Sequence, residues 1–317
     1  MAKKAFVYDG TNWIDIAQST ADLSNYANLT TNQPTFRNIF INGGFAIDQR
    51  NAGASQTITA GAALAYTVDR WYAYCTGANI TGARVAGTAP SQYYYRFTGA
   101  ASNTAVGFAQ RIEAANSFHF AGKAVTLAVN IASTSLTSIT WTAYYANTAD
   151  TFGTVASPTR TQIATGTFAV TSTLGRKTAN ITFPSAATTG IEIVFTGGAL
   201  LGSQTLTFDS AQLELGSIAT PFEQRPIGTE LALCQRYYET STNMNFYGYQ
   251  ANAGDVYRNW NIFYAVEKRI GVTPTSSGGN VTISWNGGGT RNTSGSQNIG
   301  STAGSYYVTS WIANAEL

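Results

Sequence analysis

The sequence predicts an all-β protein. We expect a jelly-roll β-sandwich, then a short helix and a smaller C-terminal β-sandwich domain, with a short N-terminal attachment arm in front. Segments with period-2 alternation or short β-branched runs recur roughly every 10–20 residues, and turn residues, among them 31 glycines, separate most of them. Past the arm only one helical pattern is convincing, so a parallel α/β sheet, which needs a helix between strands, is excluded.

Composition limits the classes of function. Of the 317 residues, 44% are hydrophobic, which is enough for a core, and only 11% are charged, against roughly 25% in typical soluble proteins. A net charge of +2 without a basic run gives no basis for nucleic-acid binding. No apolar stretch reaches the roughly 20 residues of a membrane span, and the first residues lack the apolar segment of a secretory signal.

Residues 1–36 form the predicted arm. Phe6 and Tyr8, then Trp13 and Asp15, flank a DGTN turn, which favours a small hairpin. The arm ends in an extended TTNQPT linker. So short a segment has little core of its own, and we expect it to order against another protein or another copy of the chain.

The predicted jelly-roll domain covers residues 37–222. Residues 38–51 alternate around a Gly-Gly pair, which favours a strand with a bend. The segment 66–74, YTVDRWYAY, is predicted as one strand that places Trp71 in the core. Further strands are predicted at 93–97, 106–113, 124–133, 138–147, 161–171, 176–183, 189–197 and 203–215.

A linker and short helix are predicted over residues 223–242. Leu231, Cys234 and Tyr238 recur at helical intervals. Thr229 has the side chain of an N-cap residue, so we expect the helix to begin there.

The C-terminal domain, residues 243–317, is predicted to carry the glycan site. Its aromatic residues are too dense for so small a domain to bury them all, and exposed aromatic side chains mark binding surfaces. Tyrosine and tryptophan rings stack on the apolar faces of sugars and add a polar handle. The candidates lie beside turn-rich stretches and are Tyr249, Tyr257, Trp260, Trp285 and Arg291.

Catalytic residues and cofactors are not expected. The single histidine, His119, lies between two phenylalanines and favours a structural role. No nucleophile elbow, dinucleotide fingerprint or phosphate loop is present. The 16 acidic residues keep a glycan-cleaving enzyme open, because such an enzyme needs only two carboxylates.

No metal site is assigned either. Asp209, together with the backbone of residues 42–45, is the place where a sugar-binding jelly roll would hold a structural Ca²⁺, but no second acid is evident there. Cys75 and Cys234 favour free, buried thiols, with a disulfide left open.

Two stretches resemble a family. INGGFAIDQRNAG followed by YTVDRWYAY, and later TFDSAQLELGSIATPFEQRPIGTELALCQRYYE, are similar to a pattern in phage tail-fibre and receptor-binding proteins. The resemblance covers residues 38–240. It implies a module like carbohydrate-binding modules, a helix that leads into a distal β domain, and a homotrimer. KAFVYDGTNWIDIA resembles the start of phage structural proteins that dock a fibre to the virion.

The expected function is therefore that of a non-enzymatic tail-fibre protein of a phage virion. Residues 1–36 would bind a tail or baseplate protein, and the C-terminal domain would bind a host surface polysaccharide. Two alternatives stay open: a glycan-cleaving enzyme of the virion, and a purely structural virion protein, either a fibre or a head decoration.

Overall fold

The computed structural model describes residues 6–8, 13–15, 36–61, 64–241, 246–250, 258–279, 284–297 and 304–317. The chain divides into two compact units, residues 1–37 and 38–317. In the first unit, β1 (Phe6–Tyr8) pairs antiparallel with β2 (Trp13–Asp15), which confirms the predicted hairpin.

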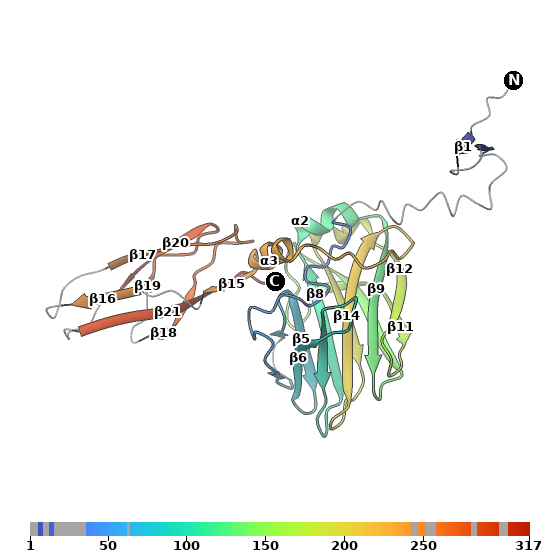
Figure 1. Cartoon of the computed structure of the whole chain (residues 1–317), viewed down its shortest axis with the longest axis horizontal. Helices are drawn as coiled ribbons and strands as arrows, with labels where there is room; N and C mark the ends of the chain where they lie inside the picture. The colour runs from blue at the N-terminus through green and yellow to red at the C-terminus, as the bar shows by residue number, and fades with distance from the viewer. Residues whose placement is uncertain are drawn as a thin grey trace. The chain divides into compact units, whose positions relative to one another are not determined.

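Two six-stranded antiparallel sheets form a β-sandwich in the second unit (Figure 1). One sheet has the order β11-β10-β13-β8-β5-β4 and the other β12-β9-β14-β7-β6-β3. The first sheet consists of β4 (Ala65–Tyr66), β5 (Trp71–Thr76), β8 (Ala105–Ile112), β10 (Ser138–Ala146), β11 (Arg160–Ala169) and β13 (Ile191–Gly197). The second consists of β3 (Gln56–Ile58), β6 (Ile80–Ala86), β7 (Tyr93–Thr98), β9 (Ala124–Ser133), β12 (Gly175–Thr182) and β14 (Thr205–Leu215).

The strand order is that of a jelly roll. Numbering the eight strands from β7 to β14 as one to eight, one sheet runs 1-8-3-6 and the other 2-7-4-5, the interleaved order of two Greek keys. Strands β3 to β6 extend one edge of each sheet. The predicted jelly roll is therefore confirmed, although β3 and β6 were not among the predicted strands.

Aromatic rings from both sheets meet in the core. The Trp71 ring stacks on Phe108 with centroids 4.8 Å apart, and Phe108 stacks on Tyr95 at 5.1 Å. All three side chains are at most 1% exposed. Because alternate residues of these strands enter the core, the residues between them face outward. The outward residues of β7, β14, β9 and β12 form the candidate site described below.

The predicted strand over residues 38–51 is wrong. This stretch holds no strand, yet Phe40 and Phe45 are fully buried. Its backbone bonds mainly to side chains and turns: the Ile41 N–H donates to Gln110 Oε1 at 2.9 Å, and Asn42 and Phe45 adopt positive φ of 59° and 55°. The apolar alternation therefore belongs here to an irregular segment, whose backbone is held by hydrogen bonds to polar side chains.

The predicted strand over residues 66–74 is a hairpin. β4 ends at Tyr66 and β5 begins at Trp71. Between them the backbone turns, with the Thr67 N–H donating to the Trp71 carbonyl at 2.8 Å and Arg70 at φ 73°. The turn places the buried Arg70 side chain where it meets the C-terminal segment.

The predicted helix is confirmed as α3 (Ile227–Gln235), but its predicted start is wrong, and Tyr238, which was part of the helical pattern, begins a strand. Pro226 occupies the N-cap position without a side-chain hydrogen bond, so Thr229 lies inside the helix. The rigid φ of proline fixes this start, and an ion pair between Arg225 and Glu230, at 2.9 Å, spans it.

Short helical segments also occur where none was predicted. They are α2 (Ala114–Ser117), η2 (Phe118–Phe120) and η3 (Ser185–Thr189). His119 lies in η2, with its ring 6.0 Å from the Phe118 ring, edge to face.

Two small sheets form the C-terminal part. One holds β15 (Tyr238–Ser241), β16 (Phe246–Gln250), β18 (Thr275–Gly279) and β21 (Gly304–Asn314), and the other holds β17 (Arg258–Phe263), β19 (Ser284–Trp285) and β20 (Asn292–Gln297). Ile262 of β17 and Trp311 of β21 share one apolar cluster. The two sheets therefore pack through a common core, as a small sandwich does.

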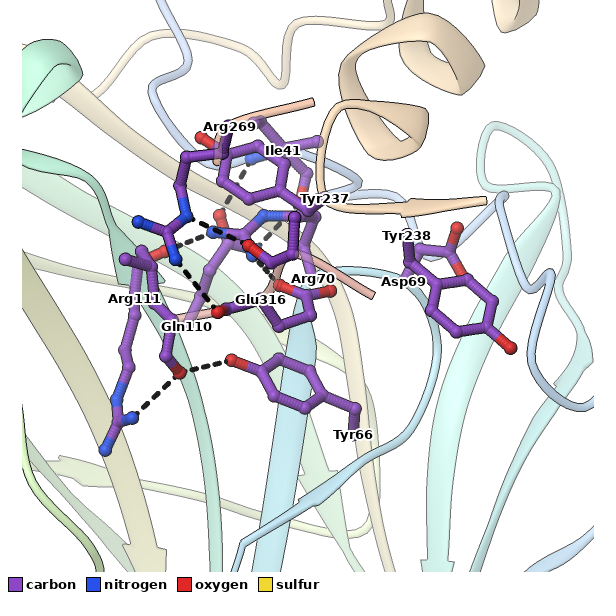
Figure 2. A network of polar contacts seen from close by, with 12 residues as sticks. Ile41, Tyr66, Asp69, Arg70, Gln110, Arg111, Tyr237, Tyr238, Arg269 and Glu316 are labelled. Atoms are coloured by element: carbon purple, nitrogen blue, oxygen red, sulfur yellow. Dashed lines mark hydrogen bonds and ion pairs between the residues drawn. The ribbon is translucent and has the colours of Figure 1, made fainter. Parts of the chain in front are cut away.

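The end of the chain is held against the jelly roll by buried charges (Figure 2). The Glu316 carboxylate pairs with Arg70 and, at 3.0 Å, with Arg50. The Leu317 carbonyl accepts hydrogen bonds from Tyr66 at 2.7 Å and from Arg111 at 2.9 Å. We call these six residues, Glu316, Leu317 and their four partners, the C-terminal latch. The latch fixes the last residues to the segment at Arg50, to β4, to the turn between β4 and β5, and to β8.

Both cysteines, Cys75 and Cys234, are free and buried, as the sequence favours. Burial raises the pKa of the Cys234 thiol well above its usual value, which keeps the thiol protonated and unreactive. Within the described ranges, no helix is long and apolar enough to cross a membrane.

Replacing Glu316 should loosen the C-terminal latch. Glu316→Gln leaves the Arg70 guanidinium, 1% exposed, without its counter-charge, and breaking a buried pair costs roughly 3–5 kcal/mol. Urea unfolding followed by tryptophan fluorescence measures this loss. The matched control is Glu267→Gln, which removes an ion pair to the exposed Arg291; equal unfolding midpoints for the two variants would contradict the latch.

Alkaline pH should weaken the fold through Tyr72. Its hydroxyl donates to Glu192 Oε1 at 2.5 Å, and burial raises the pKa of Tyr72 to about 12. Because the folded pKa is raised, the stabilisation is complete below about pH 10 and disappears as the pH rises toward 12, up to about 3 kcal/mol. Urea titrations from pH 8 to 11 should show a smaller fall in the free energy of unfolding for Tyr72→Phe than for the unmodified chain.

Candidate functional site: a groove on the outer face of the jelly roll

A groove of about 570 Å³ crosses the outer face of the β12-β9-β14-β7-β6-β3 sheet. Cross-strand register brings its polar side chains into one row: Asp209 pairs with Asn130, and Asn130 pairs with Arg176. Directly paired residues of antiparallel strands point to the same face. Residues from three strands that are distant in sequence therefore meet in the groove.

A β-bulge in β14 shapes the centre of the groove. Asp209 pairs with Asn130 and Gln212 with Ala128, so two residues of β14, Ser210 and Ala211, face one residue of β9. The extra residue reverses the inside–outside alternation. Leu206 and Phe208 enter the core before the bulge and Ala211 and Leu213 after it, while Asp209 faces the groove.

The bulge contacts the irregular segment at residues 38–51, which begins the jelly roll. The Ala211 N–H donates to the Gly43 carbonyl at 2.9 Å. The backbones approach so closely that a Cβ on Gly43 would lie 2.1 Å from the Ala211 oxygen. Only glycine fits at this position, which gives the NGG sequence a physical role.

Three donors hold the Asp209 carboxylate. Ser91 Oγ and Asn130 Nδ2 each donate to Oδ2 at 2.8 Å, and Ser210 Oγ donates to Oδ1 at 2.9 Å. The carbonyl of Gly43, within the backbone segment considered for a Ca²⁺ ion, accepts from Ala211. Among the described residues no group of three or more His, Cys, Asp or Glu side chains is arranged to hold a metal. Asp209 is thus a hydrogen-bonded carboxylate of the groove.

Two arginines bring positive charge to the same face. Arg176 Nη1 donates to the carbonyl of Ser210, a residue of the bulge, at 2.5 Å. Burial lowers the pKa of Arg176 while Glu214 and Asp209 counteract this. Arg96 of β7 is exposed and donates through Nε to Thr207 Oγ1 at 3.3 Å.

Apolar side chains complete the walls. Tyr94, Leu174 and Phe222 line the groove together with two prolines, Pro90 and Pro221. A second hollow of about 390 Å³ shares Tyr94 and Leu174 with the first and reaches Arg96 and Thr207. The two hollows adjoin at Tyr94 and Leu174, and we call them together the groove. Its mixed apolar and hydrogen-bonding character is typical of ligand sites.

The predicted site residues of the C-terminal part are only partly placed. Tyr257 lies outside the described residues, and the structure gives only the strand positions of Tyr249 in β16 and Trp260 in β17. Trp260 and Trp285 both pair with Gly295 of β20, on either side of it. The assignment of these residues to glycan binding stays a prediction.

Trp285 and Arg291 can be described in more detail. Trp285 is half-buried against the apolar cluster of the C-terminal part. Arg291 is exposed and pairs with Glu267 at 2.9 Å. Close to both in sequence, a shallow hollow of about 350 Å³ is lined by Asn286, three glycines and other small polar residues, but neither predicted residue lines it.

Sequence reasoning missed the jelly-roll groove. Tyr94, Asn130, Arg176 and Ser91 were not singled out, because each is an ordinary outward residue of its own strand or loop. The usable signal was the YYYRF segment, where Tyr94 and Arg96 alternate with the core residues Tyr95 and Phe97. The register between strands decides which residues lie beside Tyr94 and Arg96, and it cannot be predicted from the sequence of one strand.

Comparisons with known proteins give structural likenesses only. No family model matches the chain, and no curated protein matches it. A solved CBM4 structure is 18% identical over 55% of this chain and 98% of its own, with a TM-score of 0.34. TmCBM61 in complex with β-1,4-galactotriose is 12% identical over 57% and 99%, also with a TM-score of 0.34.

One likeness is to a phage protein. The enzymatically active domain of tailspike protein 4 of bacteriophage CBA120 is 14% identical over 57% of this chain and 22% of its own, with a TM-score of 0.34. All of these scores describe partial likeness. The assignment of a jelly roll follows from the strand order of this chain itself.

Proposed function

We propose that this chain is a glycan-binding fibre protein of a phage virion, and that its jelly-roll groove is a glycan site. The observation that carries the proposal is the groove: apolar Tyr94 and Phe222 lie beside the donors and acceptors of Asn130, Arg176 and Asp209. Sugar rings have apolar faces and a rim of hydroxyls, and this combination matches both. Its volume also lies in the usual range of ligand sites, about 300–1,000 Å³.

The partly similar solved structures include a carbohydrate-binding module and a complex with β-1,4-galactotriose. Those ligands belong to those proteins, and at this degree of likeness they do not identify a ligand here. The proposal rests instead on the side chains that line the groove.

The fibre role is supported by the arrangement of the chain and by the resemblance of residues 38–240 to phage tail-fibre proteins. Residues 1–37 form a compact unit of their own, which is the organisation expected of an attachment arm. The chain would act as a homotrimer in the virion tail at the host cell surface, where three weak sites gain affinity through effective concentration.

We also propose that the chain is not an enzyme. Asp209 is the one carboxylate among the described residues that line the groove, and three hydrogen bonds hold it. Glycoside hydrolysis uses two carboxylates about 5–10 Å apart. The rival, a glycan-cleaving enzyme, would release reducing ends from host polysaccharide, and loss of that release on Asp209→Asn would establish it.

Removing the tyrosine of the groove should weaken glycan binding. Tyr94→Ala deletes the ring shared by both hollows, and losing a stacking contact should lower oligosaccharide affinity about tenfold. Titration calorimetry or a glycan array measures this. The control Phe118→Ala removes an exposed ring outside the groove and should change nothing.

The same assay tests the C-terminal candidates. If Arg291→Gln abolishes binding and Tyr94→Ala does not, the glycan site lies in the C-terminal part and the groove is not the site.

Deleting residues 1–36 should separate attachment from folding. We expect the remaining chain to stay folded, trimeric and able to bind glycan, because the jelly-roll core lies within residues 38–317, but to be absent from virions. Mass measurement in solution and analysis of purified virions provide the test. Normal incorporation of the shortened chain would contradict the docking role, and a monomer would contradict the fibre.

A further inference from the structure

We propose that the groove selects an acidic polysaccharide, one whose sugars carry carboxylates. This inference rests on the proposed function and adds the chemical class of the ligand. It is carried by two arginines on an outer face where, among the described residues that line the groove, Asp209 is the one negatively charged group.

The charge of the groove favours an anion. Its charged lining residues are Arg176 and Asp209 in the larger hollow and Arg96 in the smaller one. The Asp209 oxygens already accept three hydrogen bonds within the protein. Of the charged groups of the groove, the two guanidinium groups therefore keep the most hydrogen-bonding capacity for a ligand.

Arg176 has donor capacity left. Nη1 donates to the Ser210 carbonyl, whereas Nη2 is shielded from water and has no hydrogen-bond partner in the described structure. A buried donor without a partner costs about 1–3 kcal/mol, more when it is charged. A ligand carboxylate that reaches this guanidinium would relieve that cost, and its two oxygens match the geometry of the guanidinium fork.

Arg96 adds a second point of contact. It bonds only through Nε, so its terminal nitrogens have no partner among the described residues. Arg96 lies on β7 and Arg176 on β12, with β14 and β9 between them. Three strand spacings are roughly 14 Å, which is more than one sugar ring spans. The pair therefore fits a chain of acidic sugars better than a single terminal acid.

Asp209 argues for carboxylates over phosphates. It lies beside Arg176 in register, through Asn130, and like charges repel. A singly charged carboxylate meets less repulsion there than a phosphate that carries up to two charges. Sulfated sugars, which are also singly charged, are kept as an outcome of the test.

The experiment compares matched ligands. Oligogalacturonate is compared with oligogalactose, and oligomannuronate with oligomannose, by titration calorimetry on the full chain. We expect at least one acidic member to bind about tenfold more tightly than its neutral partner, with the difference shrinking as salt rises. Arg176→Gln and Arg96→Gln should each reduce the preference for the acidic member, with thermal unfolding as a check of the fold.

A control variant lies on the same strand. Lys177→Gln removes the same charge, but neighbouring strand residues point to opposite faces, so Lys177 faces away from the groove and its loss should leave the preference intact. Equal binding of acidic and neutral partners, or tighter binding of a sulfated galactan, would overturn the carboxylate preference while leaving glycan binding in place. Failure of every oligosaccharide to bind would overturn both proposals.

Discussion

The structure depends on one extra residue in the strand at the centre of the second sheet. Leu206 and Phe208 enter the core by ordinary alternation, and the bulge at Ser210 and Ala211 lets Ala211 and Leu213 enter it as well. A regular strand of this sequence would bury a carboxylate or expose its apolar residues, since a shift of one residue moves every side chain to the other face. Fold and groove are therefore set by the same distortion.

Around the bulge, residues at the start of the jelly roll form hydrogen bonds with residues of its last strand and of the linker that follows. Asn38 accepts a hydrogen bond from the Leu213 N–H at 3.0 Å and donates to the Ala211 carbonyl at 2.9 Å. Arg225, after the strand, donates to the Phe40 carbonyl at 2.7 Å and pairs with Glu230 of α3. These residues hold the start and the end of the jelly roll together. They serve the scaffold and do not line the groove.

The same use of charge recurs at the C-terminal latch. In a chain with few charged residues, Arg70 and Glu316 are both almost fully buried. Buried pairs of this kind contribute less to net stability than to defining a single arrangement of the parts they join. The small C-terminal sheets are thereby joined to the jelly roll by polar contacts at β4, at the turn that follows it, and at β8.

Many strands could be predicted from the alternation of apolar and polar residues. Where this pattern predicted the wrong structure, the reason is physical. Residues 124–133 were predicted as a strand and form β9 with the same bounds, because four alternate residues enter the core. Alternation failed at residues 38–51, where side chains bond to much of the backbone and only isolated backbone bonds reach β14. It also failed at the turn before Trp71, where no glycine or proline marks the reversal.

The groove was harder to predict than the strands. It requires the register of β14 against β9 and of β9 against β12, and an extra residue at Ser210 that resembles any other serine in a strand. The aromatic residues of the C-terminal part drew attention instead, because their density is visible in a single sequence. Contacts between distant strands are a property of the assembled sheet.

The central claim is that ligand binds on the outer face of the jelly roll. A crystal structure of the chain with a bound acidic oligosaccharide tests it most directly. The account predicts sugar density across β7, β14, β9 and β12, with a carboxylate at Arg176 and a ring against Tyr94. Density beside Trp285 and Arg291 with nothing in the groove would contradict it.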